Sequence, residues 1–94
     1  MRQLVLTPKF KRSYRKFTQR DKKLRQRIDK TIRQMEQDVF ATFLSTHKLS
    51  GALIGLWACS CGYDCRVLFS LEFDPESREE VIVLLDIGTH DEVY

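Results

Sequence analysis

The sequence predicts one α+β domain, in the order β-α-α-β-β-β, with a helical hairpin packed on a small, mainly antiparallel sheet. Two patterns support this fold class. Apolar residues recur every three or four positions from Phe10 to Phe17 and again from Leu24 to Val39, as in helices with one buried face. After Cys65 they alternate with polar residues, as in strands. A chain of 94 residues has room for one hydrophobic core, so we expect residues 1–94 to form one domain.

A short β-prone segment at residues 4–6 leads into the first helix. Thr7 and Pro8 predict its start, because Thr caps helices and the fixed φ of Pro suits the first helical position. Apolar residues then follow at helical spacing: Phe10, Tyr14 and Phe17. Asp21 predicts the start of a second helix, and few residues separate the two, so a hairpin or a V is expected. The buried face of the second helix is expected to comprise Leu24, Ile28, Ile32, Met35 and Val39.

The rest of the chain predicts three strands joined by a loop and two turns. The strands are expected at residues 56–59, 65–73 and 80–87. Gly51 and Gly55 mark the loop before the first of them, and Asp74-Pro75-Glu76-Ser77 is typical of a turn before the last. Residues 88–94 are expected to form a polar tail on the last strand.

Charge is distributed unevenly along the chain. Residues 1–37 contain thirteen Lys and Arg and three acidic residues, whereas residues 38–94 contain three basic and ten acidic ones. The net charge of +3 therefore combines a first part of +10 with a second part of −7. Phosphate or an acidic protein is a natural partner for such a basic region. A helical hairpin with a simply solvated outer face would show the same pattern.

Composition excludes two classes of protein. A hydrophobic fraction of 43% and ten aromatic residues argue against disorder. The longest apolar run, residues 81–85, is far too short to cross a bilayer, and no signal segment follows Met1. We therefore expect a small, soluble, cytoplasmic domain with no membrane partner.

Two histidines are candidates for proton transfer. His47 lies in a predicted loop, and His90 follows the last predicted strand. Because imidazole titrates near neutrality, two exposed histidines can share general acid and base roles. A lone surface histidine is more often incidental, so position alone does not decide between the two interpretations.

Other residues suit phosphodiester chemistry. Asp64 can orient a histidine or accept a proton, and Arg66 and Lys48 can hold a phosphate and offset its developing charge. The plainer alternative for Arg66 is an outward strand residue paired with an acid. Trp57 and Tyr94 can stack on unpaired bases, although ordinary packing is the better interpretation for Trp57.

Three cysteines, Cys59, Cys61 and Cys65, form a C-x-C-x₃-C pattern across a predicted turn. With a histidine they could bind zinc, but the spacing lacks the C-x₂-C pairs of common zinc sites. An odd number of cysteines in a cytoplasmic chain favours reduced, partly buried thiols. The chain also lacks a Gly-rich phosphate loop, a nucleophile elbow and an HExxH motif, so we expect no metal and no cofactor.

Three segments resemble the RelE/ParE superfamily of toxins from bacterial type II toxin–antitoxin systems, and above all its YafQ-like mRNA interferases. They are His47-Lys48-Leu49-Ser50-Gly51, Gly62-Tyr63-Asp64-Cys65-Arg66-Val67 and Gly88-Thr89-His90-Asp91-Glu92-Val93-Tyr94. The resemblance extends over essentially the whole chain. His47 and Asp64 are also seventeen positions apart, like the matching histidine and aspartate of YafQ-type toxins.

This resemblance implies a ribosome-dependent, metal-independent endoribonuclease that cuts mRNA in the A site. The ribose 2′-hydroxyl attacks the adjacent phosphate and leaves a 2′,3′-cyclic phosphate and a 5′-hydroxyl. The residues implied in catalysis are His47 and His90 for proton transfer, the carboxylate Asp64, the phosphate-stabilising Arg66 and the C-terminal aromatic Tyr94. Where YafQ-type toxins have a further acid and a third histidine, this chain has Ala58 and Ser60.

The basic helices have two expected partners, the ribosome with its mRNA and a cognate antitoxin with an acidic C-terminal tail that wraps the toxin. The expected RNA-binding residues are Lys9, Arg12, Lys16, Lys23, Arg27, Lys48 and Trp57. A non-enzymatic ParE-type toxin that inhibits DNA gyrase and an inactive basic RNA-binding relative are the alternatives. The pair of histidines favours the nuclease, since the ParE branch does not require them.

Overall fold

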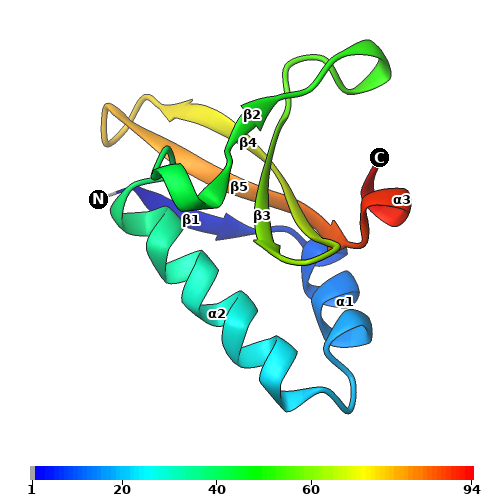
Figure 1. Cartoon of the computed structure of the whole chain (residues 1–94). Coiled ribbons are helices and arrows are strands. Elements are labelled where there is room, and N and C mark those ends of the chain that lie inside the picture. Colours follow the sequence, from blue (N-terminus) through cyan, green and yellow to red (C-terminus); the bar gives the residue numbers. More distant parts are fainter. Residues whose placement is uncertain (1) are drawn as a thin grey trace.

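Figure 1 shows a five-stranded sheet with two long helices on one of its faces. The computed structural model describes residues 2–94, so Met1, the first residue of the expected domain, lies outside the described residues. The strands are β1 (Gln3–Leu6), β2 (His47–Lys48), β3 (Trp57–Gly62), β4 (Cys65–Asp74) and β5 (Glu79–Gly88). The helices are α1 (Pro8–Phe17), α2 (Lys22–Gln37) and α3 (His90–Val93), with 3₁₀ turns η1 (Thr42–Leu44) and η2 (Gly51–Leu53).

The sheet has the order β1-β5-β4-β3-β2. β1 runs parallel to β5, and every other neighbouring pair is antiparallel. The predicted α+β class, with a helical pair on a mainly antiparallel sheet, is therefore confirmed. The sequence missed β2, because a two-residue strand is too short to show an alternating pattern.

The predicted polar tail is wrong, since the chain after β5 forms the short helix α3. Thr89 and Glu92 begin this helix with a capping box, in which each side chain accepts a hydrogen bond from the other residue's backbone N–H. Val93 is buried and anchors α3 to the sheet. The signal was present in the sequence as a Thr followed three positions later by Glu.

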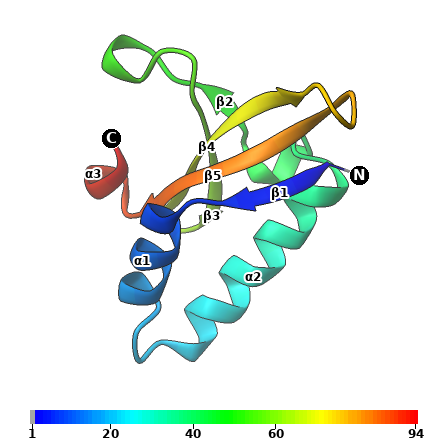
Figure 2. The ribbon, with the colours of Figure 1, turned by 180° about the vertical axis from the view of Figure 1, so that it is seen from behind.

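The two long helices begin where the sequence predicts. The side chain of Thr7 accepts a hydrogen bond from the Phe10 N–H at 3.1 Å, and that of Asp21 accepts one from the Leu24 N–H at 3.0 Å. The helices diverge as a V below the sheet in both views (Figures 1 and 2). Within residues 2–94, no helix is long and apolar enough to cross a membrane.

The hydrophobic core lies between these helices and one face of the sheet. α1 contributes Phe10, and α2 contributes Ile28 and Met35, all at most 1% exposed. The strands contribute Cys59, Val67, Phe69, Ile82, Leu84 and Ile87. The apolar spacing in the sequence thus identified the core residues of α1 and α2. Val39, expected on the second helix, is buried but follows the end of α2 at Gln37. The two long helices leave the opposite face of the sheet uncovered, and His47 and Arg66 lie on that face.

Candidate active site

The five predicted catalytic residues come from separate segments that converge where β5 runs into α3. His47 lies on β2, Asp64 in the β3–β4 turn, Arg66 on β4, His90 at the start of α3 and Tyr94 just after it. His47 pairs with Ala58 across the β2–β3 ladder, and Arg66 pairs with Gly88 across the β4–β5 ladder. The register of the sheet, rather than proximity in sequence, therefore builds this site.

His47 is oriented by the backbone that precedes β2. Its Nδ1 donates a hydrogen bond to the carbonyl oxygen of Ser45 at 2.9 Å. Because a carbonyl can only accept, this contact places the proton of a neutral ring on Nδ1 and leaves a lone pair on Nε2. Nε2 lies 3.5 Å from the hydroxyl of Tyr94. The nitrogen that can accept a proton thus faces the site.

His90 and Tyr94 form the other side of the site. Their ring centroids are 4.5 Å apart at an interplanar angle of 80°, an edge-to-face contact across one turn of α3. His90 Nδ1 lies 3.6 Å from the exposed carboxylate of Asp91. The Tyr94 ring therefore contacts His90 while its hydroxyl approaches His47.

Partial burial raises the pKa of the Tyr94 phenol above its ordinary value, and the nearby positive charge of Arg66 opposes that rise. The phenol consequently stays protonated at neutral pH. Tyr94 can then donate a hydrogen bond as well as offer a ring for stacking.

Asp64 holds the start of α3 in place. Its Oδ1 accepts a hydrogen bond from the backbone N–H of His90 at 3.0 Å, which satisfies a helix-terminal donor that has no partner within the helix. Asp64 has a φ of 50°, in the left-handed region that Asp tolerates better than most residues. The contact shown is with the backbone of His90 and not with its imidazole.

Arg66 is held over the β3–β4 turn. Its Nη1 donates hydrogen bonds to the carbonyl oxygens of Cys65 at 2.9 Å and Gly62 at 3.3 Å, and contacts Ser60 Oγ at 3.5 Å. Among residues 2–94, no carboxylate lies within ion-pair distance of this guanidinium. The sequence alternative of an Arg66 paired with an acid is therefore not observed, and its positive charge remains available to a phosphate.

Lys48 and Trp57 lie on the opposite face of the sheet from His47. They pair with each other across β2 and β3, one position from the His47–Ala58 pair, and neighbouring strand residues point to opposite faces. Trp57 packs against the core and meets Phe40 edge to face, while Lys48 Nζ lies 5.5 Å from its ring centroid. The structure thus does not bring these two predicted RNA-binding residues to the catalytic group.

The predicted basic residues of the helices are distributed over both helices. Lys9 lies 3.4 Å from Asp86, and Lys16 lines a hollow of about 310 Å³ together with Glu92 of α3. Arg27 of α2 packs on Gly62, where an added Cβ would come within 2.8 Å of the guanidinium. Arg12 and Lys23 are exposed on their helices. Of the five residues, Lys9, Lys16 and Arg27 therefore lie beside β5, α3 or the β3–β4 turn, which carry site residues or adjoin them.

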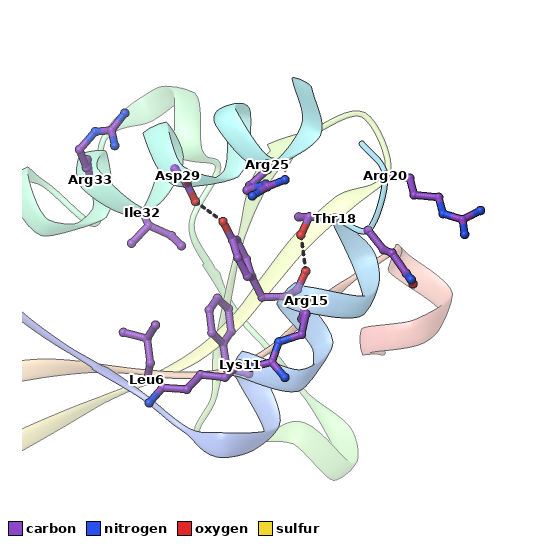
Figure 3. A pocket seen from close by; sticks show the side chains of 12 residues that line it. Leu6, Lys11, Arg15, Thr18, Arg20, Arg25, Asp29, Ile32 and Arg33 are labelled. Carbon is purple, nitrogen blue, oxygen red and sulfur yellow. Dashed lines mark hydrogen bonds between the residues drawn. The ribbon is translucent and has the colours of Figure 1, made fainter. Parts of the chain in front are cut away.

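Sequence reasoning did not anticipate a groove of about 690 Å³ between α1 and α2 (Figure 3). Its apolar lining includes Leu6, Phe10 and Ile32, and its basic residues are Lys11, Arg15, Arg20, Arg25 and Arg33. Inside it, the Tyr14 hydroxyl donates a hydrogen bond to Asp29 at 2.6 Å. Burial, and then Asp29, raise the pKa of Tyr14 to about 12. The sequence did contain a sign of this groove, because basic residues flank the apolar positions of both predicted helices.

The cysteines differ from expectation. Cys61 and Cys65 form a disulfide, so the prediction of three reduced thiols is wrong for this pair. The tight turn between β3 and β4 brings their Cα atoms to 5.0 Å, within the range that a disulfide spans. Cys59 remains a buried free thiol whose sulfur faces Met35. Within residues 2–94, no group of three His, Cys, Asp or Glu is placed to hold a metal ion.

Solved structures show the same fold. YafQ from E. coli strain BL21(DE3) has a TM-score of 0.78 at 11% identity, over 100% of this chain and 99% of that chain. The YoeB/ParE toxin from Agrobacterium tumefaciens has a TM-score of 0.75 at 18% identity, over 94% and 98%. A chain of the E. coli DinJ-YafQ complex has a TM-score of 0.77 at 12% identity, over 100% and 99%. No curated protein matches the chain in sequence.

A family model gives the most direct assignment. The family described as "Bacterial toxin of type II toxin-antitoxin system, YafQ" matches residues 2–94. This match spans every element from β1 to α3, and the solved structures above share their arrangement. The chain belongs to the YafQ family of toxins from bacterial type II toxin–antitoxin systems.

Proposed function

We propose that this toxin is a ribosome-dependent, metal-independent endoribonuclease that cuts mRNA in the A site. One observation carries the proposal: His47, Tyr94 and His90 follow one another in contact, beside an Arg66 that no carboxylate neutralises within residues 2–94. Two imidazoles and a guanidinium that no carboxylate neutralises supply the acid, base and charge that cleavage of RNA by its own 2′-hydroxyl needs.

The orientation of the His47 ring suggests which histidine is the base, and leaves His90 as the acid. His47 Nε2 takes the proton of the 2′-hydroxyl, since Nδ1 already donates to Ser45. The 2′-oxygen then attacks the adjacent phosphorus, and the bond to the 5′-oxygen breaks. His90 in its charged form protonates that leaving oxygen, and Arg66 offsets the extra negative charge on the phosphorane. The products are a 2′,3′-cyclic phosphate and a 5′-hydroxyl.

The openness of the site supports dependence on the ribosome. His47, Asp64, His90 and Tyr94 are all exposed, so these side chains do not enclose a substrate. An enzyme of this kind gains rate when another body holds the RNA strand in the reactive geometry. The ribosome is the proposed holder, and the mRNA codon is the substrate.

The basic residues are proposed to dock the toxin on RNA. Lys9, Arg12, Lys16, Lys23 and Arg27 supply the positive charge on the helices. Lys48 and Trp57 form a separate cation–aromatic pair on the other sheet face, so their proposed contact with RNA lies outside the catalytic group. Neutralising phosphates releases counterions, so docking should weaken steeply as salt increases.

A cognate antitoxin is the second proposed partner, with an acidic C-terminal tail that folds on the toxin. Solved complexes of YafQ with DinJ show that the E. coli toxin of this fold binds another protein. In this chain the groove of α1 and α2 offers an apolar floor with basic residues around it (Figure 3). The double variant Arg25→Glu/Arg33→Glu should lower the affinity of the antitoxin by at least about tenfold, measured by calorimetry.

The decisive experiment maps mRNA ends in cells that express the toxin. We expect cuts within codons of translated messages and none in the same messages when their start codon is removed. His90→Gln should abolish these cuts while it leaves antitoxin binding intact. Intact messages with broken DNA would favour the gyrase alternative, and intact messages with intact DNA would favour an inactive RNA-binding relative.

A further inference from the structure

The disulfide closes the turn on which the site depends. Cys61 lies near the end of β3 and Cys65 begins β4, with three residues between them. Two of these three, Gly62 at 134° and Asp64 at 50°, have positive φ values. Between them, Tyr63 is 98% exposed. The disulfide therefore fastens the base of a tight, exposed turn.

The contacts of two site residues originate in this turn. Arg66 donates to the carbonyl oxygens of Gly62 and Cys65, and the His90 N–H donates to the carboxylate of Asp64. The turn thus holds the phosphate-binding candidate on one side and the start of α3 on the other. A change in its conformation would move both at once.

Cys59 is chemically separate from this pair. Its sulfur is buried and lies 3.7 Å from Met35 Sδ, between β3 and α2. Burial also raises the pKa of the Cys59 thiol to about 12, so the reactive thiolate is scarce at neutral pH. The chain therefore contains one disulfide-forming pair and one unreactive thiol rather than three equivalent cysteines.

We propose that Cys61 and Cys65 are a reversible thiol–disulfide site, and that the disulfide form orders the turn that positions Arg66 and His90. The expected cytoplasmic location is reducing, and disulfides in such compartments are usually transient or redox-sensing. The activity part of this inference rests on the proposed nuclease function. The claim that the disulfide orders the turn depends only on the contacts of the turn.

The chemistry is an exchange with a small disulfide such as oxidised glutathione. One thiolate attacks that disulfide, forms a mixed disulfide and releases one glutathione thiolate. The second cysteine thiolate then displaces the second glutathione, and the protein pair has lost two electrons and two protons in total. Reduced glutathione or a dithiol reverses both steps. Because Cys61 and Cys65 are buried beside an exposed turn, local opening of the turn admits the reagent.

The first test compares oxidised and reduced forms of the full chain without any substitution. Alkylation and mass spectrometry define the two forms, with one free thiol in the first and three in the second. Hydrogen exchange of the His90 amide, followed by NMR, should be about tenfold faster in the reduced form. Equal exchange in the two forms would overturn the proposal.

Two variants test whether the change in His90 amide exchange depends on Cys61 and Cys65. Cys61→Ser/Cys65→Ser should show the fast exchange of the reduced form in every buffer, whereas Cys59→Ala should keep the full redox response. A double variant that still responds to reductant would overturn the proposal, as would a Cys59→Ala chain that no longer responds.

A final measurement separates this inference from the proposed function. On ribosomes programmed with mRNA, the oxidised form should cleave about tenfold faster than the reduced form. A chain that changes its His90 exchange with redox state but cuts no RNA would uphold the thiol–disulfide site and count against the nuclease alone. Equal cleavage by the two forms, in an active chain, would overturn the link between the turn and the site.

Discussion

The groove between α1 and α2 and the site at the end of β5 hold their polar groups in different ways. In the groove, Tyr14 and Asp29 share a hydrogen bond of 2.6 Å. In the site, the hydroxyl of Tyr94 and Nε2 of His47 are 3.5 Å apart, and both residues are exposed. The groove pair thus shares a short hydrogen bond within the protein, whereas the site pair makes only a long contact and is open to a ligand.

This difference fits the two tasks proposed above, catalysis at the site and partner binding at the groove. A bonded, partly buried pair such as Tyr14 and Asp29 contributes to the stability of the helical V. Long, loosely aligned contacts among exposed side chains are common in catalytic sites without substrate, where they tighten only on binding. Substitutions in the two regions should therefore have opposite profiles, with catalytic effects at the site and stability effects in the groove.

His47→Gln should have the largest effect. Glutamine keeps a polar side chain but cannot accept and hold the proton of a ribose hydroxyl, so cleavage should fall on the order of 10³-fold. The free energy of unfolding should hardly change, because His47 is exposed. Single-turnover cleavage of ribosome-bound mRNA and urea denaturation measure the two quantities. A fully active variant would remove His47 from the proposed mechanism.

Arg66→Gln should reduce cleavage on the order of 10²-fold, since it removes the charge proposed to stabilise the phosphorane. Arg78→Gln is its matched control. It removes the same charge from the acidic half of the chain, in the turn after Asp74, whereas Arg66 lies at the other end of β4. Equal losses in both variants would point to overall electrostatic attraction in place of a local role for Arg66.

Thr89→Ala should reduce cleavage about fivefold and the free energy of unfolding by about 1 kcal/mol, because it breaks the cap that starts α3. Thr7→Ala removes the corresponding cap from α1 and the hydrogen bond from Thr7 to the Leu84 carbonyl, so it should cost at least as much stability with no change in cleavage. Thermal melts and cleavage rates of both variants test whether α3 matters to the site specifically. Equal losses of cleavage in Thr89→Ala and Thr7→Ala would contradict a specific role for α3.

Tyr14→Phe should leave cleavage unchanged and lower the free energy of unfolding by about 1 kcal/mol at neutral pH. Folding raises the pKa of Tyr14 from 10 to about 12, so the folded state retains its proton more strongly. The stabilisation is therefore complete below pH 10 and is lost as pH rises to about 12.

Urea denaturation of wild type and Tyr14→Phe across this range measures the effect, with Tyr63→Phe as the exposed control. The difference in stability between wild type and Tyr14→Phe should shrink as pH increases. A difference that stays constant or grows between pH 10 and 12 would rule out this assignment of the proton.

The structure separates residues that the sequence grouped together. Lys48 follows His47 directly, and the resemblance to RelE-type toxins included both in one segment. The two side chains nevertheless leave opposite faces of the sheet, because neighbouring strand positions alternate. Only the pairing of β2 with β3 reveals that this segment is a strand at all.

Local patterns in the sequence were enough to predict the class of fold, the starts of α1 and α2 and the residues that both helices bury. These features depend on spacings of three or four residues and on caps such as Thr7 and Asp21, which are local. The sequence also named the five candidate catalytic residues, although nothing local showed that they would meet.

The contacts between distant side chains, in contrast, depend on how the strands and helices pack together. The contact between His47 and Tyr94 joins residues 47 positions apart and depends on the register of the sheet and on the helix α3. The link between Cys61 and Cys65 depends on the conformation of the turn between two strands. Such contacts are set by the packing of whole elements, which no spacing along one segment encodes.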